Sequence, residues 1–354
     1  MRPVFFLFSL MIFLLISCKQ TKISSKELPL SAEQSQIVDS CYLFELLHAD
    51  DNRLVASLLY SSDQLMTIPI RDSILILEGH EEFLKKGRGD AEVINALYKI
   101  HQDTIHVVSF TGTGIDKIIK IPFAGIDDYS SWKITGTPLY QGLYLGMNFD
   151  VLDDDIYVFA GGKIDDEGVI CCVDNKDFDI EQLDFVPQDK NDCSSVVKHI
   201  VYSSESKVFV NGKNLLYVCG KGRLALIIDS INGSTRNLYD ECPVYSAATD
   251  GINYRLSPKS HLGFYAYASD SMIYLSPILA RLVNGMYDPA EYKGYPSYFI
   301  DRIDVFSWEG KKHYTLCLEY PSSSFVINER GDRLYALSEN PNTGDQVVYV
   351  YNLP

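Results

Sequence analysis

The sequence predicts an all-β fold: a six-bladed β-propeller with four-stranded antiparallel blades, preceded by a lipoprotein signal peptide. Three observations lead to this prediction. Short apolar or alternating runs occur throughout the chain, whereas convincing amphipathic helices are scarce. A turn-then-strand motif recurs along the chain. The N-terminus carries an apolar segment that ends at a cysteine.

The recurring motif is a turn residue, an aliphatic residue, a Tyr or other large residue, and a second aliphatic residue. Asp or Asn makes the turn by bonding its own backbone, and β-branched and aromatic residues fill a strand that is buried on both faces. The copies are DSILIL at Asp72, DTIHVV at Asp103, DDIYVF at Asp154, NLLYVC at Asn214, DSMIYL at Asp270 and DRLYAL at Asp332.

Most copies are followed by a polar turn and a second apolar run. These runs are KIIKIPF at Lys117, GVICCVD at Gly168, LALIID at Leu224 and QVVYVYNLP at Gln346. Successive units lie roughly 30 to 60 residues apart, which is near the length of a propeller blade. Six copies therefore predict six blades around a central channel. An irregular pair of β-sandwiches is the alternative, because the copies are degenerate and unevenly spaced.

The N-terminal residues predict export. Arg2 precedes an apolar run over residues 4–16 that is too short to span a bilayer comfortably, so the run indicates a secretory signal. The run ends in LISC at Cys18, and a small residue directly before Cys resembles the lipobox of bacterial lipoproteins. This resemblance implies cleavage before Cys18 and its lipidation, which would bind the chain to a membrane. An ordinary signal peptide with a chance Cys is the alternative.

These features divide the chain into three parts. Residues 1–17 are the expected signal peptide, residues 18–37 the lipidated Cys18 and a flexible tether, and residues 38–354 the propeller. No Asp follows Cys18 at the second mature position, where it would resemble an inner-membrane retention signal. We therefore expect an outer-membrane location, on either the periplasmic face or the cell surface.

The charge balance excludes one class of ligand. The chain has 31 Lys and Arg against 47 Asp and Glu, a formal net charge of −16. Nucleic-acid binding requires a basic face, so we expect no nucleic-acid partner.

The eight Cys include no CxxC pair and no zinc-like spacing to a His. We predict neither a metal nor a cofactor, and a disulfide pairing cannot be deduced.

The segment GRGDAE, from Gly87 to Glu92, is similar to a GRGxxE element of the TolB-like six-bladed propeller lipoproteins of Bacteroidota. The lipobox and the C-terminal run from FSWEGKK to VYVYNLP carry the same resemblance. It implies a propeller fold and an envelope location, but no activity. We expect Gly87, Arg88, Gly89 and Glu92 to form a tight connection between blades. The glycines would permit positive φ, and Glu92 would pair with Arg88 or cap the turn. Adhesion through Arg-Gly-Asp and a phosphate loop are disfavoured.

Residues 276–301 interrupt the strand rhythm and are rich in Tyr, Pro and Gly. Long loops on a rigid scaffold are common binding sites, and Tyr offers a flat apolar face with a hydroxyl. We hypothesise that this insertion binds a glycan, a peptide or an envelope protein. The candidate contacts are Tyr287, Tyr292, Tyr295, Tyr298 and, from a second loop, Trp132. An insertion that packs its aromatic residues on its own blade is the alternative.

We predict no catalytic residue. No nucleophile elbow is present, and the acidic runs at 153–155, 165–167 and 174–181 are typical of blade turns, with a calcium ion as the remaining alternative. The sequence therefore favours a non-catalytic binding module. The alternative is a propeller hydrolase or lyase whose active site is assembled at the channel mouth from several blades.

Overall fold

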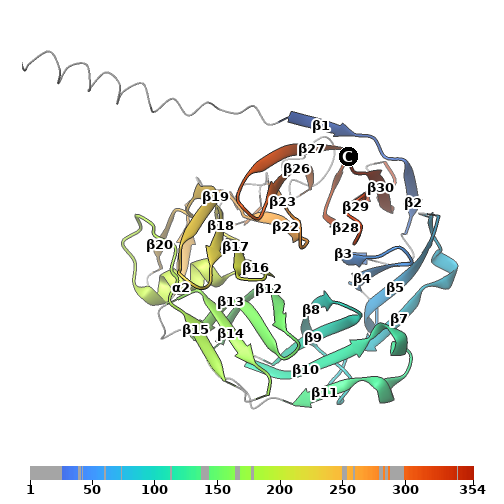
Figure 1. Cartoon of the computed structure of the whole chain (residues 1–354), viewed down its shortest axis with the longest axis horizontal. Helices are drawn as coiled ribbons and strands as arrows, with labels where there is room; N and C mark the ends of the chain where they lie inside the picture. The colour runs from blue at the N-terminus through green and yellow to red at the C-terminus, as the bar shows by residue number, and fades with distance from the viewer. Residues whose placement is uncertain are drawn as a thin grey trace, which may run out of the picture.

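The computed structural model of the chain describes residues 26–354 except 39–40, 42, 60, 73, 112–113, 137–142, 164–167, 177–178, 249–252, 258–259, 279–281, 284–285, 288–298 and 341. Six β-sheets stand radially around one axis, as Figure 1 shows, which confirms the predicted six-bladed propeller. Among the described residues, no helix has both the length and the apolar character needed to cross a membrane.

The first three blades follow one another along the chain, each from an inner strand beside the axis to the rim. Blade 1 contains β3 (Leu43–Ala49), β4 (Arg53–Leu58), β5 (Asp63–Arg71), and the short β6 (Ile74–Leu75) and β7 (Glu81–Lys85), which both pair with β5. Blade 2 contains β8 (Asn95–His101), β9 (Thr104–Thr111), β10 (Gly114–Pro122) and β11 (Lys133–Gly136). Blade 3 contains β12 (Leu143–Asp153), β13 (Ile156–Lys163), β14 (Ile170–Asp174) and β15 (Ile180–Leu183).

The remaining blades use both ends of the chain. Blade 4 contains β16 (Lys207–Asn211), β17 (Asn214–Val218), β18 (Arg223–Asp229) and β19 (Thr235–Glu241). Blade 5 contains β22 (Phe264–Ala268), β23 (Met272–Pro277), β26 (Ile300–Ser307), β27 (Lys312–Ser322) and β1 (Lys26–Leu30). Blade 6 contains β28 (Ser324–Ile327), β29 (Arg333–Glu339), β30 (Gln346–Asn352) and β2 (Gln34–Ile37).

The connections carry short elements of their own. They are the 3₁₀ turns η2 (Leu77–Gly79), η3 (Phe123–Gly125) and η4 (Tyr129–Ser131), helix α2 (Ser195–Ser203), and the hairpins β20 (Tyr245–Ala247) with β21 (Tyr254–Leu256) and β24 (Leu282–Val283) with β25 (Met286–Tyr287). The Ser194 hydroxyl caps α2 by accepting from the backbone N–H of Val197 at 3.4 Å.

The repeated motif marks the second strand of a blade in five of its six copies. The turn residues Asp103, Asp154, Asp270 and Asp332 precede β9, β13, β23 and β29, and Asn214 is the first residue of β17. The copy at Asp72 is misassigned, because it precedes only the two-residue edge strand β6. The second strand of blade 1 is β4, whose own turn is formed by Asp51 and Asn52. That strand reads RLVASL, without the large central residue of the other copies.

The N-terminal segment is a strap that closes the ring, and this corrects the expected extent of the tether. Strand β1 pairs in parallel with β27, and β2 pairs antiparallel with β30 as the rim strand of blade 6. Leu28 and Leu30 pack on the cluster shared by blades 5 and 6. Blade 6 has only three strands of its own, so residues 26–37 supply the missing edge and belong to the propeller.

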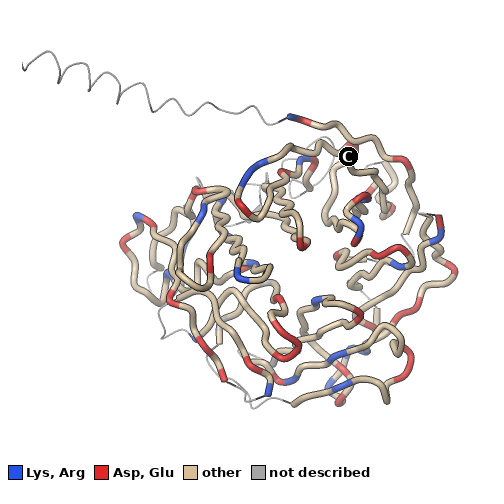
Figure 2. The backbone as a smooth tube through the Cα atoms, in the orientation of Figure 1, with Lys and Arg blue, Asp and Glu red and all other residues tan. Residues whose placement is uncertain are grey.

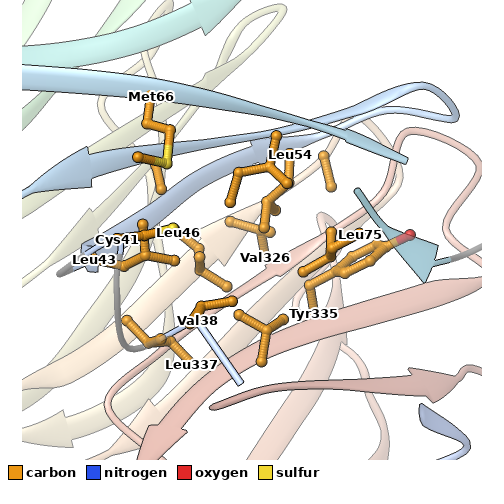
Figure 3. Close-up of a cluster of buried hydrophobic side chains, with 14 of the residues drawn as sticks. Val38, Cys41, Leu43, Leu46, Leu54, Met66, Leu75, Val326, Tyr335 and Leu337 are labelled. Atoms are coloured by element: carbon orange, nitrogen blue, oxygen red, sulfur yellow. The ribbon is translucent and has the colours of Figure 1, made fainter. Parts of the chain in front are cut away.

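The core is divided into clusters that join neighbouring blades. Figure 3 shows the cluster between blades 1 and 6, which includes Leu54, Met66, Val326 and Tyr335, all at most 1% exposed. Burying a side chain of this size stabilises the fold by about 1.5–3 kcal/mol. A second apolar cluster, which includes Leu216, joins blades 4 and 5. The inner strands are therefore fixed in space by apolar packing, which positions the turns at their ends.

Candidate functional site at one end of the axis

The turns between the first and second strands of all six blades lie at one end of the axis, which we call the acidic end. It is formed by residues 50–52, 102–103, 154–155, 212–213, 269–271 and 328–332. Five of these six turns carry carboxylates, namely Asp50, Asp51, Asp103, Asp154, Asp155, Asp270, Glu329 and Asp332. The basic residues in the same turns are Lys213 and Arg330. Figure 2 shows acidic positions, together with some basic ones, around the middle of the ring.

The opposite end carries both signs of charge. It is formed by the turns between second and third strands and by the connections between blades. Its described acidic residues are Asp90, Glu92, Asp184, Asp189, Asp192, Glu205 and Asp345, and its described basic residues are Lys86, Arg88, Lys190, Lys198, Lys221 and Arg255. Among the described turns and connections, the excess of acidic over basic residues is therefore greater at the acidic end, where it would attract cations.

His48 and Glu329 meet at the acidic end from blades 1 and 6. His48 Nε2 lies 3.6 Å from Glu329 Oε1, and the side chain of Glu329 is 64% exposed. His48 itself is buried and packs against the ring of Phe123 at a centroid distance of 6.0 Å. Burial lowers the pKa of His48 to about 4, and Arg53 and Lys99 contribute in the same direction against Asp50. The imidazole is therefore neutral at physiological pH.

Asn148 and Asp150 join blade 3 to the free edge of β16 in blade 4. The Asn148 side chain accepts from the backbone N–H of Val208 at 2.8 Å and donates to its carbonyl at 2.9 Å. Asp150 Oδ2 accepts from the N–H of Val210 at 2.8 Å. Two side chains on one face of β12 thus replace the strand partner that β16 lacks on this edge.

Charged side chains also cross between blades near the axis. Lys99 Nζ of blade 2 lies 2.9 Å from Asp150 Oδ1 and 5.5 Å from the centre of the Phe209 ring of blade 4. Lys207 Nζ of blade 4 lies 3.7 Å from Glu45 Oε1 of blade 1, which stands on the opposite side of the ring. Each of these charged groups is engaged in a contact between blades.

Trp132 does not form an exposed platform. Its side chain is buried, with 7% of the residue exposed, and its indole N–H donates to the carbonyl of Gly125 at 3.0 Å. The ring packs against Tyr129 with centroids 4.6 Å apart. Trp132 therefore anchors the long turn between β10 and β11, and little of its surface is accessible to a ligand.

Gly87 to Glu92 connects β7 to β8, the blade-to-blade position that the sequence predicts. Glu92 Oε2 accepts from the N–H of Gly89 at 2.8 Å, so Glu92 caps the turn. Neither Gly87 nor Gly89 adopts positive φ, contrary to the expectation. A Cβ on Gly87 would lie 2.0 Å from Glu92 Oε2, so a larger residue there would displace the Glu92 carboxylate from its capping position. Arg88 is exposed.

The remaining predicted site residues lie largely outside the described part of the chain. Cys18, Tyr292, Tyr295 and Tyr298 fall outside the described residues, and of Tyr287 only the backbone is described, in β25. The insertion itself lies between β23 and β26, as the interrupted strand rhythm indicates. Binding by these tyrosines stays a prediction.

The acidic runs form turns where they are described. Asp155 lies 2.8 Å from Lys120 Nζ and 3.2 Å from Lys176 Nζ, and a hydrogen bond from Lys120 is the largest of the interactions that lower its pKa. The N–H of Lys176 donates to Asp174 at 2.7 Å. Among the described residues, no group of three or more His, Cys, Asp and Glu has an arrangement that could hold a metal ion.

One buried polar centre has no signal in the sequence. Asp189, whose side chain is 1% exposed, accepts from the hydroxyls of Tyr202 at 2.8 Å and Tyr245 at 2.7 Å, and lies 3.1 Å from Lys198 Nζ. Burial alone would raise the pKa of Asp189, but hydrogen bonds from Asn191, the two tyrosines and Lys198 outweigh burial and lower it. The centre fixes α2 and β20 at the end opposite the acidic one. No disulfide joins any two of the seven described cysteines.

Known proteins resemble this chain in fold. A member of the DUF4221 family from Bacteroides vulgatus superimposes with a TM-score of 0.56 at 10% identity, over 91% of this chain and 97% of that one. The β-propeller domain of Cps50 (Swd1) from Myceliophteria thermophila gives a TM-score of 0.42 at 11% identity, over 92% of this chain and 100% of that one. An oligogalacturonate lyase in complex with manganese gives a TM-score of 0.40 at 11% identity, over 93% of this chain and 98% of that one.

The likeness to the DUF4221 protein supports the propeller fold and no activity, because the identity is only 10%. No protein-family model matches the chain. No curated protein matches it either.

Proposed function

We propose that the protein is an envelope lipoprotein whose propeller is a non-catalytic binding module. The observation that carries this proposal is the pairing of the axial charges between blades. Glu45 with Lys207, and Lys99 with Asp150, tie inner strands of different blades together. A hydrolase or lyase at the channel mouth would need such groups to act on a substrate. Here they brace a rigid ring that presents turns at its two ends.

The proposed membrane anchor rests on the lipobox, and the strap sets how far the propeller can lie from it. Cys18 is the proposed lipidated residue, and β1 begins at Lys26. The eight residue steps from Cys18 to Lys26 can span at most about 29 Å when fully extended. The propeller would therefore stay close to the outer-membrane surface, on its periplasmic face or outside the cell, where a glycan, a peptide or an envelope protein would be its ligand. Two or more acyl chains on one Cys give stable anchoring.

Two experiments test the two halves of the proposal. Cells are labelled with an alkyne fatty acid, and the wild type should incorporate it and fractionate with outer membranes, whereas Cys18→Ala should do neither.

Lysine-reactive cross-linking of intact cells, followed by mass spectrometry, tests binding. A recurrent partner cross-linked to lysines at one axial end supports a binding module. Turnover of a glycan or peptide by the purified protein would contradict it.

A further inference from the structure

Glu329 and Asp103 are among the acidic-end carboxylates that have no Lys or Arg partner in the described chain, and their charges act on each other. Their neighbours are paired: Asp50 lies 3.3 Å from Arg53 Nε, and Asp51 pairs with Arg330. For Glu329 and Asp103, no Lys or Arg of the described chain lies within ion-pair distance. Burial, then Asp50, Asp103 and Asp51, raise the pKa of Glu329. The acidic end thus holds a group of like charges that a cation would stabilise.

A buried acceptor points at the same place. His48 is 8% exposed, and its Nε2 has no hydrogen-bond partner in the described part of the chain. This atom is directed toward Glu329 Oε1, 3.6 Å away, which is too long for a hydrogen bond. A buried nitrogen without a partner is costly. In the tautomer with its proton on Nδ1, neutral His48 offers an acceptor, and a small rotation of the exposed Glu329 side chain would uncover it.

The chain itself shows which cation suits this surface. The guanidinium of Arg53 lies 4.5 Å above the ring of Phe123 and pairs with Asp50, and Phe123 packs against His48. A guanidinium offers five N–H donors in a planar fork, so it can reach two carboxylates and an imidazole at once. An ammonium group is a compact point charge without this geometry.

We infer that the acidic end binds an arginine side chain of a partner protein, held between Glu329 and Asp103 beside His48. This inference rests on the proposed binding function and specifies the chemistry of the partner. The arginine would donate to both carboxylates and to Nε2 of His48, and its positive charge would relieve the repulsion among the acids. The rest of the partner would contact the surrounding turns.

The test uses the purified mature chain and two fluorescent peptides at an ionic strength near 0.15 M, where long-range attraction is screened. One peptide carries two adjacent arginines between Gly and Ser residues, and the other carries lysines instead. The test variant is a double substitution at the acidic end, which combines Asp103→Asn with Glu329→Gln. The matched control is Asp184→Asn with Asp192→Asn, which removes the same charge from exposed residues at the opposite end.

The arginine peptide should bind the wild type more tightly than the lysine peptide. The acidic-end double variant should weaken arginine binding about three- to tenfold, and the control should leave it within twofold. Equal loss in both double variants, equal affinity for the two peptides, or no binding to the wild type would each overturn the inference. The cross-linked partner proposed above could still be found at another surface, so the two failures are distinguishable.

Discussion

Glu45 Oε1 lies 3.7 Å from Lys207 Nζ, although the two residues belong to blades on opposite sides of the ring. The contact braces the ring across its axis. The lysine side chain is 18% exposed and the glutamate side chain 43% exposed, so water weakens the pair. We expect a coupling energy of about 0.2–1 kcal/mol from a double-mutant cycle of Glu45→Gln and Lys207→Met, measured by urea unfolding. Additive effects would show that the contact does not brace the ring.

Loss of the Asn148 side chain should destabilise the junction of blades 3 and 4. Asn148→Leu leaves both the N–H and the carbonyl of Val208 without their partner, at a cost of about 1–3 kcal/mol in the free energy of unfolding. Asn237→Leu on the exposed rim strand β19 is the control and should change stability by less than about 0.5 kcal/mol. Equal values for the two variants would contradict the structural role of Asn148.

Removal of the strap should weaken the whole ring. A chain that begins at Val38 lacks β1 and β2, which leaves the apolar rim of blades 5 and 6 uncovered. We expect a loss of at least about 3 kcal/mol, measured by thermal and urea unfolding. A chain that begins at Lys26 retains both strands and should match the full mature chain. If the shorter chain is equally stable, residues 26–37 do not close the propeller.

Stability should fall as the pH decreases from about 6.5 toward 4. Burial is the main reason that the pKa of both His48 and His106 is lowered to about 4. Between pH 4 and the ordinary histidine pKa of 6.5, the unfolded chain binds protons that the native chain does not. Each histidine would remove up to roughly 3 kcal/mol across this range.

The melting temperature measured from pH 7.5 to 4.5 checks this dependence. His106→Gln should flatten the profile, whereas His80→Gln, at a more exposed position, should not. A wild-type profile that is level between pH 7 and 5 would refute the expected burial of neutral histidines.

The fold could be predicted because each blade repeats one local rule. An Asp or Asn turn followed by an apolar run is visible in the sequence, and five of the six copies mark second strands. Blade 1 was the exception, since β4 lacks the large central residue. The strap was also missed, because its strands alternate only weakly and their partners, β27 and β30, lie at the far end of the chain.

The candidate site could be predicted less well. The motif acids at Asp103, Asp154, Asp270 and Asp332 were recognised as turn formers, but their gathering at one end follows from the ring. Contacts such as Glu45–Lys207 and His48–Glu329 join residues far apart in sequence, and no local pattern encodes them. Asp189 had no signal because its partners come from α2 and the β20 strand, which the strand rhythm does not predict.

The most direct test of the account places a photo-activated cross-linking residue at single positions in the full chain in living cells. Asn52 and Ser271 lie at the acidic end, Lys190 and Asn342 at the opposite end, and Asn237 on the rim; all are exposed. We expect one partner protein to be cross-linked from Asn52 and Ser271, and this cross-link to be lost when Glu329→Gln and Asp103→Asn are added. Cross-links only from Lys190, Asn342 or Asn237 would contradict the assignment of binding to the acidic end.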